Sequence, residues 1–207
     1  MASLSESVGP PSSAQSKPLQ HAPGIAQPRS LRPARRVYEE LALHPFVLAS
    51  GAALVLVDLL RFGLSPRSVA GIILLPALVV LSAIDFRHRL LPNRIVLPAT
   101  ALVLVSQLAL APDHGREAAL AAVAAGGAFL LLRVVYPKGL GMGDVKLALL
   151  LGAGLGWDVM SAVFVGSLAA AAAGLVVVAR DGAAGRKAIL PFGPFLAAGA
   201  ALAFFFA

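Results

Sequence analysis

The sequence predicts an all-α membrane protein, a polytopic bundle of about seven transmembrane helices (six to eight). Of its 207 residues, 58% are hydrophobic and 13% are charged, with a mean hydropathy of +0.85. A soluble domain is about 45–50% apolar and about 25% charged. The apolar residues also form long runs without a polar face, as membrane spans do. This composition excludes a soluble enzyme, a disordered chain and a coiled coil.

The first 36 residues differ from the rest of the chain. They are rich in Ser, Pro, Gln and Ala, they contain six prolines, and they end in four arginines between Arg29 and Arg36. Prolines interrupt helices, and no apolar face recurs here. We therefore expect residues 1–36 to form a disordered, basic, Pro-rich cytoplasmic tail and residues 37–207 to form the transmembrane domain.

Seven apolar segments follow the tail at regular intervals. A helix needs roughly 17–25 residues to cross the hydrocarbon core, and most of the segments reach that length. The fifth segment is short, so it is either a half-helix or it continues through Gly154 and Gly156 into the next one; we count it as a span. The predicted spans are residues 44–60, 68–85, 94–111, 117–136, 145–156, 158–179 and 190–206.

The positions of Lys and Arg predict the orientation. With seven spans and the N-terminus inside, thirteen of the 17 basic residues fall in the tail and the inside loops. The outside loops hold Arg61, Arg67 and Arg116, and Arg133 falls within a span. The positive-inside rule therefore favours a cytoplasmic N-terminus. The net charge of +7 is then a sign of topology, and we expect no nucleic-acid partner.

Two of the ten acidic residues, Asp85 and Asp144, are candidates for chemistry because each lies at the cytoplasmic end of a predicted span. A carboxylate at membrane depth is costly and usually faces a cavity or a partner. The alternative is that each is a helix cap or an ion-pair partner of a nearby basic residue. Asp58, three residues before Arg61, is expected to be structural, with its carboxylate reaching the interface.

Residues that break helices surround both candidates. Gly141 and Gly143 allow unusual backbone conformations and close approach before Asp144, and Pro92 fixes a break after Asp85. A third inside segment, 185–195, holds further Gly and Pro residues. Irregular backbone at membrane depth is tolerated where protein buries it or water lines it. The three segments are therefore expected to line a wet cavity that holds both carboxylates.

This pair predicts aspartic proteolysis. Two carboxylates that share a site hold a proton between them. One then accepts a proton from water while the other donates to the scissile carbonyl oxygen. No nucleophilic side chain is needed, and the chain has no cysteine. We expect no metal and no cofactor, because an Asp85-x-x-His88 spacing alone is weak evidence for a metal site.

Three stretches, residues 84–93 (IDFRHRLLPN), 141–147 (GMGDVKL) and 191–195 (PFGPF), resemble the signature motifs of type IV prepilin peptidases, membrane aspartic proteases of the GxGD class. The resemblance covers roughly residues 40–207. It implies that Asp85 and Asp144 are the catalytic pair and that Gly141 and Gly143 shape the loop that presents Asp144. The supporting residues that it implies are Lys146, Pro92, Asn93, Pro191, Gly193 and Pro194.

The resemblance also implies a substrate and a location. Such enzymes lie in the bacterial inner (plasma) membrane and cut the short basic leader from prepilins and pseudopilins on the cytoplasmic face, just before the hydrophobic helix of the substrate. The expected partners are thus these substrates and the lipid bilayer. Many members also methylate the new N-terminus and carry paired cysteines that bind zinc. Because this chain has no cysteine, we expect a peptidase without methyltransferase activity, as in short members linked to tight-adherence pili.

Three alternatives stay open. A transporter that uses the aspartate pair for ion or proton coupling would be expected to show internal repeats, and no convincing repeat is visible. A lipid-modifying enzyme is suggested by residues 179–182, but it would need further aspartates and none follows Asp181. The third alternative is an inactive structural relative.

Overall fold

The computed structural model describes residues 44–137, 139–182 and 190–206, and this part of the chain is helical without strands. The predicted fold class, an all-α bundle of about seven apolar helices, is confirmed. The predicted tail at residues 1–36 lies outside the described residues. The helices are α2 (Pro45–Phe62), α3 (Pro66–His88), α4 (Asn93–Leu110), α5 (Pro112–Val135), α6 (Met142–Leu155), the 3-10 helix η1 (Gly156–Asp158), α7 (Val159–Asp181) and α8 (Gly193–Phe206).

Each predicted apolar segment coincides with one α-helix, and the ends differ by a few residues. The largest difference is at α5, which begins at Pro112 rather than at residue 117. Proline is favoured in the first turn because that turn has no use for its missing N–H. Asp113 lies in the same turn, at the positive end of the helix dipole, where a negative charge is favourable. The polar first turn of α5 therefore belongs to the helix, although its composition resembles a loop.

Most of these helices have the length and composition of membrane spans. Five stretches are long and apolar enough to cross a membrane: α2, α3, α4, α5 and the stretch Met142–Asp181, which contains α6 and α7. α8 is a shorter apolar helix. Large apolar side chains such as Leu60, Leu131 and Val135 are at least two-thirds exposed on the outside of the bundle. Such a surface suits contact with lipid.

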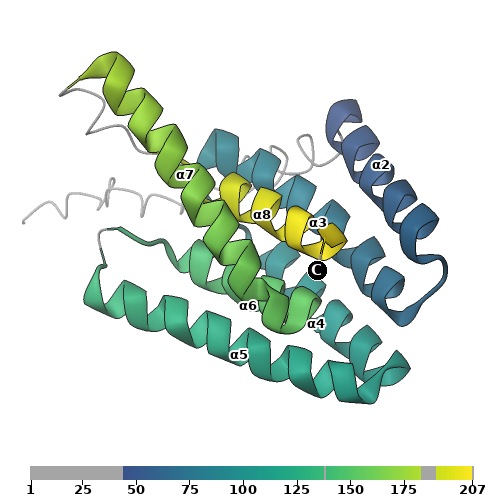
Figure 1. Cartoon of the computed structure of the whole chain (residues 1–207). Coiled ribbons are helices and arrows are strands. Elements are labelled where there is room, and N and C mark those ends of the chain that lie inside the picture. The colour runs from purple at the N-terminus through teal and green to yellow at the C-terminus, as the bar shows by residue number, and fades with distance from the viewer. Residues whose placement is uncertain (1–43, 138, 183–189, 207) are drawn as a thin grey trace, which may run out of the picture.

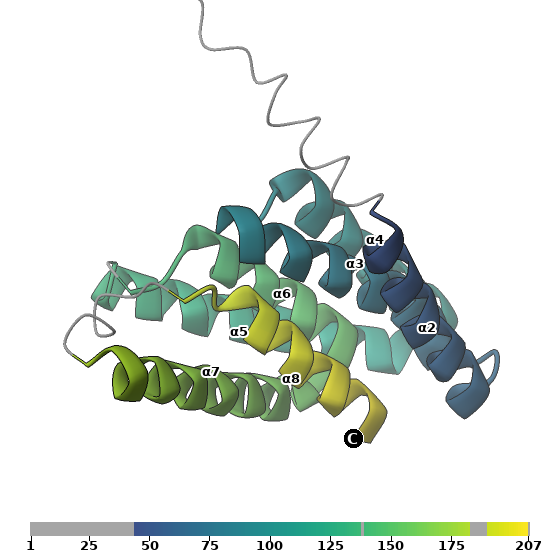
Figure 2. The same ribbon diagram turned by 90° about the horizontal axis from the view of Figure 1, so that it is seen from above.

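The short fifth segment is a separate helix, α6, at the centre of the bundle (Figures 1 and 2). Most of its residues are buried, as expected for a helix that is apolar on all sides. It ends at Gly156, whose φ of 59° is strained for residues with a side chain. Of the two interpretations of this segment, a continuous helix into α7 is thus wrong, because η1 turns the chain between α6 and α7.

Successive α-helices run in alternating directions, which gives the bundle two ends. The end of α3 and the starts of α6 and α8 lie at one end, which carries Asp85 and Asp144 and is called the aspartate end below. η1, the start of α3 and the end of α8 lie at the other, called the far end. α7 returns to the aspartate end beside α8, with its Gly166 against Leu196 and its Gly174 against Leu190.

Candidate active site

Asp85 lies in the last turn of α3, and its side chain is only 7% exposed. Its Oδ2 accepts a hydrogen bond from the backbone N–H of Gly193, the first residue of α8, at 3.0 Å. The chain leaves the helix directly afterwards, because Arg89 adopts the left-handed conformation (φ 52°) and its N–H donates to the carbonyl of Asp85. The carboxylate therefore joins the end of α3 to the start of α8.

Glycine is the only type of residue that fits at position 193 without displacing this carboxylate. A Cβ at that position would lie 2.6 Å from Oδ2 of Asp85 and 3.1 Å from its Cγ. Two prolines flank the position, Pro191 before α8 and Pro194 as its second residue, where a proline is tolerated. The carbonyl of Phe192 accepts the N–H groups of the first turn. The PFGPF stretch thus starts α8 and brings to Asp85 a backbone N–H that has no side chain beside it.

Asp144 lies in the first turn of α6 and is half-buried. Its Oδ2 accepts the backbone N–H of Gly141 at 3.0 Å, a contact that closes the start of the helix. A carboxylate there is also favoured by the helix dipole. Leu91, six residues after Asp85, packs on Gly143, which directly precedes Asp144. The structure therefore brings the two predicted aspartates, 59 positions apart, to one end of the bundle from separate helices.

The glycines before Asp144 serve close packing. Neither Gly141 nor Gly143 has a positive φ, so the expectation that they supply unusual backbone conformations is wrong. At Gly143, a Cβ would lie 2.8 Å from Cδ1 of Leu91, in the link between α3 and α4. At Gly141, it would lie 3.2 Å from Oδ2 of Asp144. Gly143 thus lets the α3–α4 link pack against the start of α6.

Lys146 and Asn93 form a second contact between these segments. Nζ of Lys146 donates to Oδ1 of Asn93 at 2.5 Å, in an exposed position. Asn93 is the first residue of α4, and Pro92, in extended conformation, precedes it. The two side chains tie the start of α4 to the first turns of α6, so they support the loop structure around Asp144.

Two positioning residues were missed by the sequence analysis. Nη1 of Arg133, in the last turn of α5, donates to the carbonyl of Leu140 at 2.6 Å, one residue before the Gly141 N–H that binds Asp144. Leu91 packs on Gly143, as described above. For Arg133, its position inside a predicted span could have suggested a role, because charged residues within spans are rare and usually have one. No signal in the sequence distinguishes Leu91 from other leucines.

Asp58 differs from the expectation. It does not reach the interface: it is fully buried, and neither carboxylate oxygen has a hydrogen-bond partner. The predicted neighbour Arg61 instead lies over the rings of Phe62 and Phe206. Asp58 is covered because Gly71 of α3 lets the two helices approach closely; a Cβ there would lie 2.8 Å from Oδ2 of Asp58. Spacing along one helix did not show this packing between helices.

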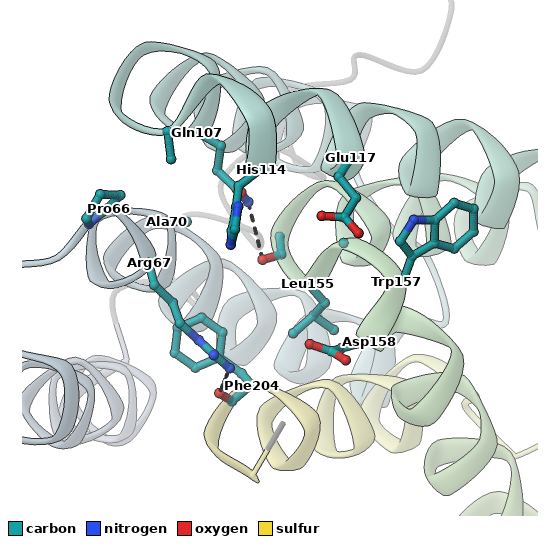
Figure 3. A pocket seen from close by; sticks show the side chains of 13 residues that line it. Pro66, Arg67, Ala70, Gln107, His114, Glu117, Leu155, Trp157, Asp158 and Phe204 are labelled. Atoms are coloured by element: carbon teal, nitrogen blue, oxygen red, sulfur yellow. Dashed lines mark hydrogen bonds between the residues drawn. The ribbon is translucent and has the colours of Figure 1, made fainter.

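A pocket of about 260 Å³ lies at the far end, and Figure 3 shows the side chains that line it. Neither Asp85 nor Asp144 is among them. Nη2 of Arg67 donates to the carbonyl of Phe204 at 2.6 Å, and Nε2 of Gln107 donates to that of Ala153 at 2.7 Å. Among the residues that the structure describes, no group of three His, Asp or Glu side chains is arranged to hold a metal. The pocket's charged and polar lining comprises Arg67, Gln107, His114, Glu117 and Asp158.

The chain matches one protein family. A model described as the type IV leader peptidase family matches residues 72–178, a stretch that contains both aspartates and ends before the PFGPF motif. No solved structure matches the chain.

Curated proteins with similar sequences carry related names. The prepilin leader peptidase/N-methyltransferase of Burkholderia pseudomallei (strain 1026b) is 38% identical over 174 residues, 80% of this chain and 55% of that protein. The protein of the same name from Bacillus subtilis (strain 168) is 31% identical over 71% of this chain and 59% of its own length. Leader peptidase HopD of Escherichia coli is 35% identical over 58% of this chain and 81% of its own length. The chain therefore spans about half the length of the N-methyltransferase relatives.

Proposed function

Because the chain belongs to the type IV leader peptidase family, we propose that it is a membrane aspartic endopeptidase that removes the leader from type IV prepilins or pseudopilins. Asp85 and Asp144 are its catalytic pair. The observation that carries this proposal is their convergence: two carboxylates from separate helices lie at the same end of an apolar bundle. Both lie inside the stretch that matches the family.

The pair acts on a peptide bond through water. The ionised carboxylate takes a proton from a water molecule, whose oxygen attacks the carbonyl carbon, while the protonated carboxylate donates its proton to the carbonyl oxygen. In the second step the C–N bond breaks, and the departing nitrogen takes a proton from the carboxyl group that was protonated by water. The other carboxylate takes back a proton from a hydroxyl group of the tetrahedral intermediate. The products are a carboxyl group on the leader and a free amine on the mature protein. No covalent intermediate with the enzyme is formed.

The active site faces the cytoplasm in this proposal. Among the described residues, the aspartate end carries Arg87, Arg89, Arg94, Lys146 and Arg180, whereas Arg61, Arg67 and Arg116 lie toward the far end. Basic residues concentrate on the cytoplasmic side of membrane proteins. The protein is then a multi-pass protein of the bacterial inner membrane. The absence of methyltransferase activity stays a prediction from the sequence.

The proposal is tested by leader removal in cells. The chain is expressed with a prepilin from the same genome, and the size of the pilin is followed on gels. We expect Asp85→Asn and Asp144→Asn each to reduce cleavage by about 10³-fold or more, because each removes a proton acceptor and donor. The matched control is Asp113→Asn, an exposed carboxylate in the first turn of α5, which is expected to cleave normally.

Membrane insertion of every variant is measured in parallel. Cleavage that persists in either aspartate variant with normal insertion would show that the two-aspartate mechanism is wrong. Failure of the wild type to cut any prepilin of that genome would contradict the substrate class.

A further inference from the structure

Arg133, in the last turn of α5, is half-buried and makes a contact outside its own helix. An arginine at the end of a membrane-spanning helix usually extends to the interface or binds the last carbonyls of that helix, which have no helical partner. Nη1 of Arg133 instead donates to the carbonyl of Leu140 at 2.6 Å, in the link between α5 and α6. A charged side chain therefore binds the link that precedes Asp144.

The peptide group that Arg133 binds also binds Asp144. The carbonyl of Leu140 and the N–H of Gly141 belong to one planar peptide group, and they point in opposite directions. Arg133 donates to its oxygen, and Oδ2 of Asp144 accepts its N–H at 3.0 Å. These two hydrogen bonds and the bond lengths between them place Nη1 of Arg133 no more than about 8 Å from Oδ2 of Asp144. One peptide group thus connects a positive charge to a candidate catalytic carboxylate.

This connection affects both the position and the charge of Asp144. A guanidinium at the carbonyl oxygen polarises the peptide group, and hydrogen bonds in such a chain strengthen one another. A hydrogen bond from an N–H to a carboxyl group stabilises the ionised form more than the protonated form. At this separation the positive charge also attracts the carboxylate directly. Arg133 therefore favours an ionised Asp144 that stays bonded to the Gly141 N–H.

Other charged groups lie at the same end of the bundle. Lys146, two residues after Asp144, donates to Asn93, and α8 carries no titratable residue. The remaining titratable side chains of the described residues at this end are Asp85, Arg87, His88 and Arg89 of α3, Arg94 of α4, Tyr136 after α5, and Arg180 and Asp181 of α7. All of these except Asp85 are exposed, and solvent and salt screen exposed charges. Arg133 differs because its charge is bonded to the peptide group that binds Asp144.

We propose that Arg133 is a positioning residue of the peptidase: through the peptide group between Leu140 and Gly141, it holds Asp144 in place and stabilises its ionised form. This inference rests on the proposed function and gives a role to a residue outside the three motifs. The aspartate pair works with one carboxyl group ionised and the other protonated. Arg133 thereby helps to set the pH range in which the pair holds a single proton.

The test compares Arg133→Met, which removes the charge and the donor, with Arg133→Lys, which keeps both. Each variant is purified in detergent, and kcat and KM for a full-length prepilin are measured as a function of pH. The kcat/KM of the wild type should fall at low and at high pH, because the pair must hold one proton. For Arg133→Met we expect kcat to fall about tenfold or more with KM within about twofold of wild type, as for a residue that acts on the chemical step.

The pH profile separates an effect on charge from support of the link alone. In Arg133→Met, at least one limb of the profile should move to higher pH by about 0.5 unit or more, because a carboxylate that is stabilised less keeps its proton to higher pH. Arg133→Lys should keep both limbs within about 0.2 unit of wild type, since the charge remains. Arg116→Met is the matched control, an exposed arginine of the same helix at the far end, and it should behave as wild type.

A lower kcat in Arg133→Met with both limbs unchanged would show that the arginine only supports the link, and the proposal would be wrong. Limbs that move as far in Arg133→Lys as in Arg133→Met would also overturn it, because the charge would then not be the cause. If Arg133→Met does not fold, the limbs are measured in the uncharged but polar Arg133→Gln, with the same expectation.

Wild-type cleavage of the same prepilin separates the two levels of inference. If the wild type cuts and the variants at position 133 keep its kcat and its pH profile, the role of Arg133 is wrong and the proposed function stands. If the wild type does not cut, the proposed function fails and the role of Arg133 fails with it.

Discussion

At the scale of single residues, Gly193 and Asp85 act as one unit. The glycine supplies the N–H that binds Oδ2 at 3.0 Å, and its lack of a side chain leaves the space that this oxygen occupies. The hydrogen bond fixes the direction of a carboxylate that is buried at the end of α3. An orientation fixed before substrate binds lowers the cost of reaching the transition state.

Gly193→Ala is therefore expected to reduce kcat by tenfold or more with little change in KM. The new methyl group displaces the end of the Asp85 side chain, which can rotate away, so the apparent melting temperature in detergent should change little. Gly174→Ala is the matched control, because a Cβ there meets only Cδ1 of Leu190 at an ordinary 3.7 Å. A normal kcat in Gly193→Ala would show that the orientation of Asp85 is not limiting.

The contact between Lys146 and Asn93 is expected to contribute modestly. Both side chains are on an exposed surface, where charged hydrogen bonds stabilise by about 0.2–1 kcal/mol. In a double-mutant cycle, Lys146→Ala and Asn93→Ala should show a coupling of that size, and each should keep cleavage within about fivefold of wild type. A loss as large as that of Asp144→Asn would instead place Lys146 in contact with the substrate.

The sequence predicted the two aspartates but not the bonds that hold them. Asp85 and Asp144 were identifiable because few acidic residues occur, and because Asp85 ends one apolar run and Asp144 begins another. The Asp85–Gly193 bond joins residues 108 positions apart and depends on how α8 packs on α3. Asp58 shows the same limit, since its burial comes from α3 and α8 rather than from its own helix.

At the scale of helices, the position of Asp144 depends on how closely α6 approaches α5. Gly152 of α6 lies against the backbone of Ala121 and Ala122; a Cβ at position 152 would be 2.5 Å from Cα of Ala122 and 2.7 Å from the carbonyl oxygen of Ala121. Contacts between backbones cannot be relieved by a change of rotamer. The two helices would have to separate.

Gly152→Ala is expected to lower the free energy of unfolding by about 1–3 kcal/mol, the usual cost of overpacking. Gly127→Ala, on α5, has no atom within 4 Å of the new Cβ and should stabilise by roughly 0.5–1 kcal/mol through helix propensity. Thermal unfolding of both purified variants in detergent measures the difference. Equal melting temperatures would mean that α5 and α6 are not packed as closely as described.

Helix positions were predictable because apolar runs in a membrane protein end where polar residues begin. What could not be predicted is the packing order, because every face of these helices is apolar and no amphipathic stripe marks the buried side. The boundary between α6 and α7 shows this: the sequence around Gly156 suits either a continuous helix or a turn. The positive φ of Gly156 and the 3-10 helix η1 show that the chain turns there.

At the scale of the whole molecule, the alternation of the helices ties the chemistry to one face of the membrane. α6 has only 14 residues, which rise about 21 Å, less than the roughly 30 Å of a hydrocarbon core. It nevertheless runs from the aspartate end to η1 at the far end. If α6 crosses, α7 returns to the cytoplasmic side and Arg180 lies there with the other basic residues.

Cysteine labelling tests this crossing directly, because the chain has no cysteine of its own. Tyr136→Cys places a single thiol at an exposed position at the aspartate end, and Trp157→Cys places one at an exposed position in η1. Asp113→Cys places one in the first turn of α5, at the far end of the bundle. With spheroplasts and a membrane-impermeant maleimide, we expect labelling at positions 113 and 157, and at position 136 only after the membrane is permeabilised. Protection at both 136 and 157 would show that α6 does not cross. Arg180, at the end of α7, would then face outward, against the positive-inside rule. The proposed cytoplasmic position of Gly193 would have to be abandoned.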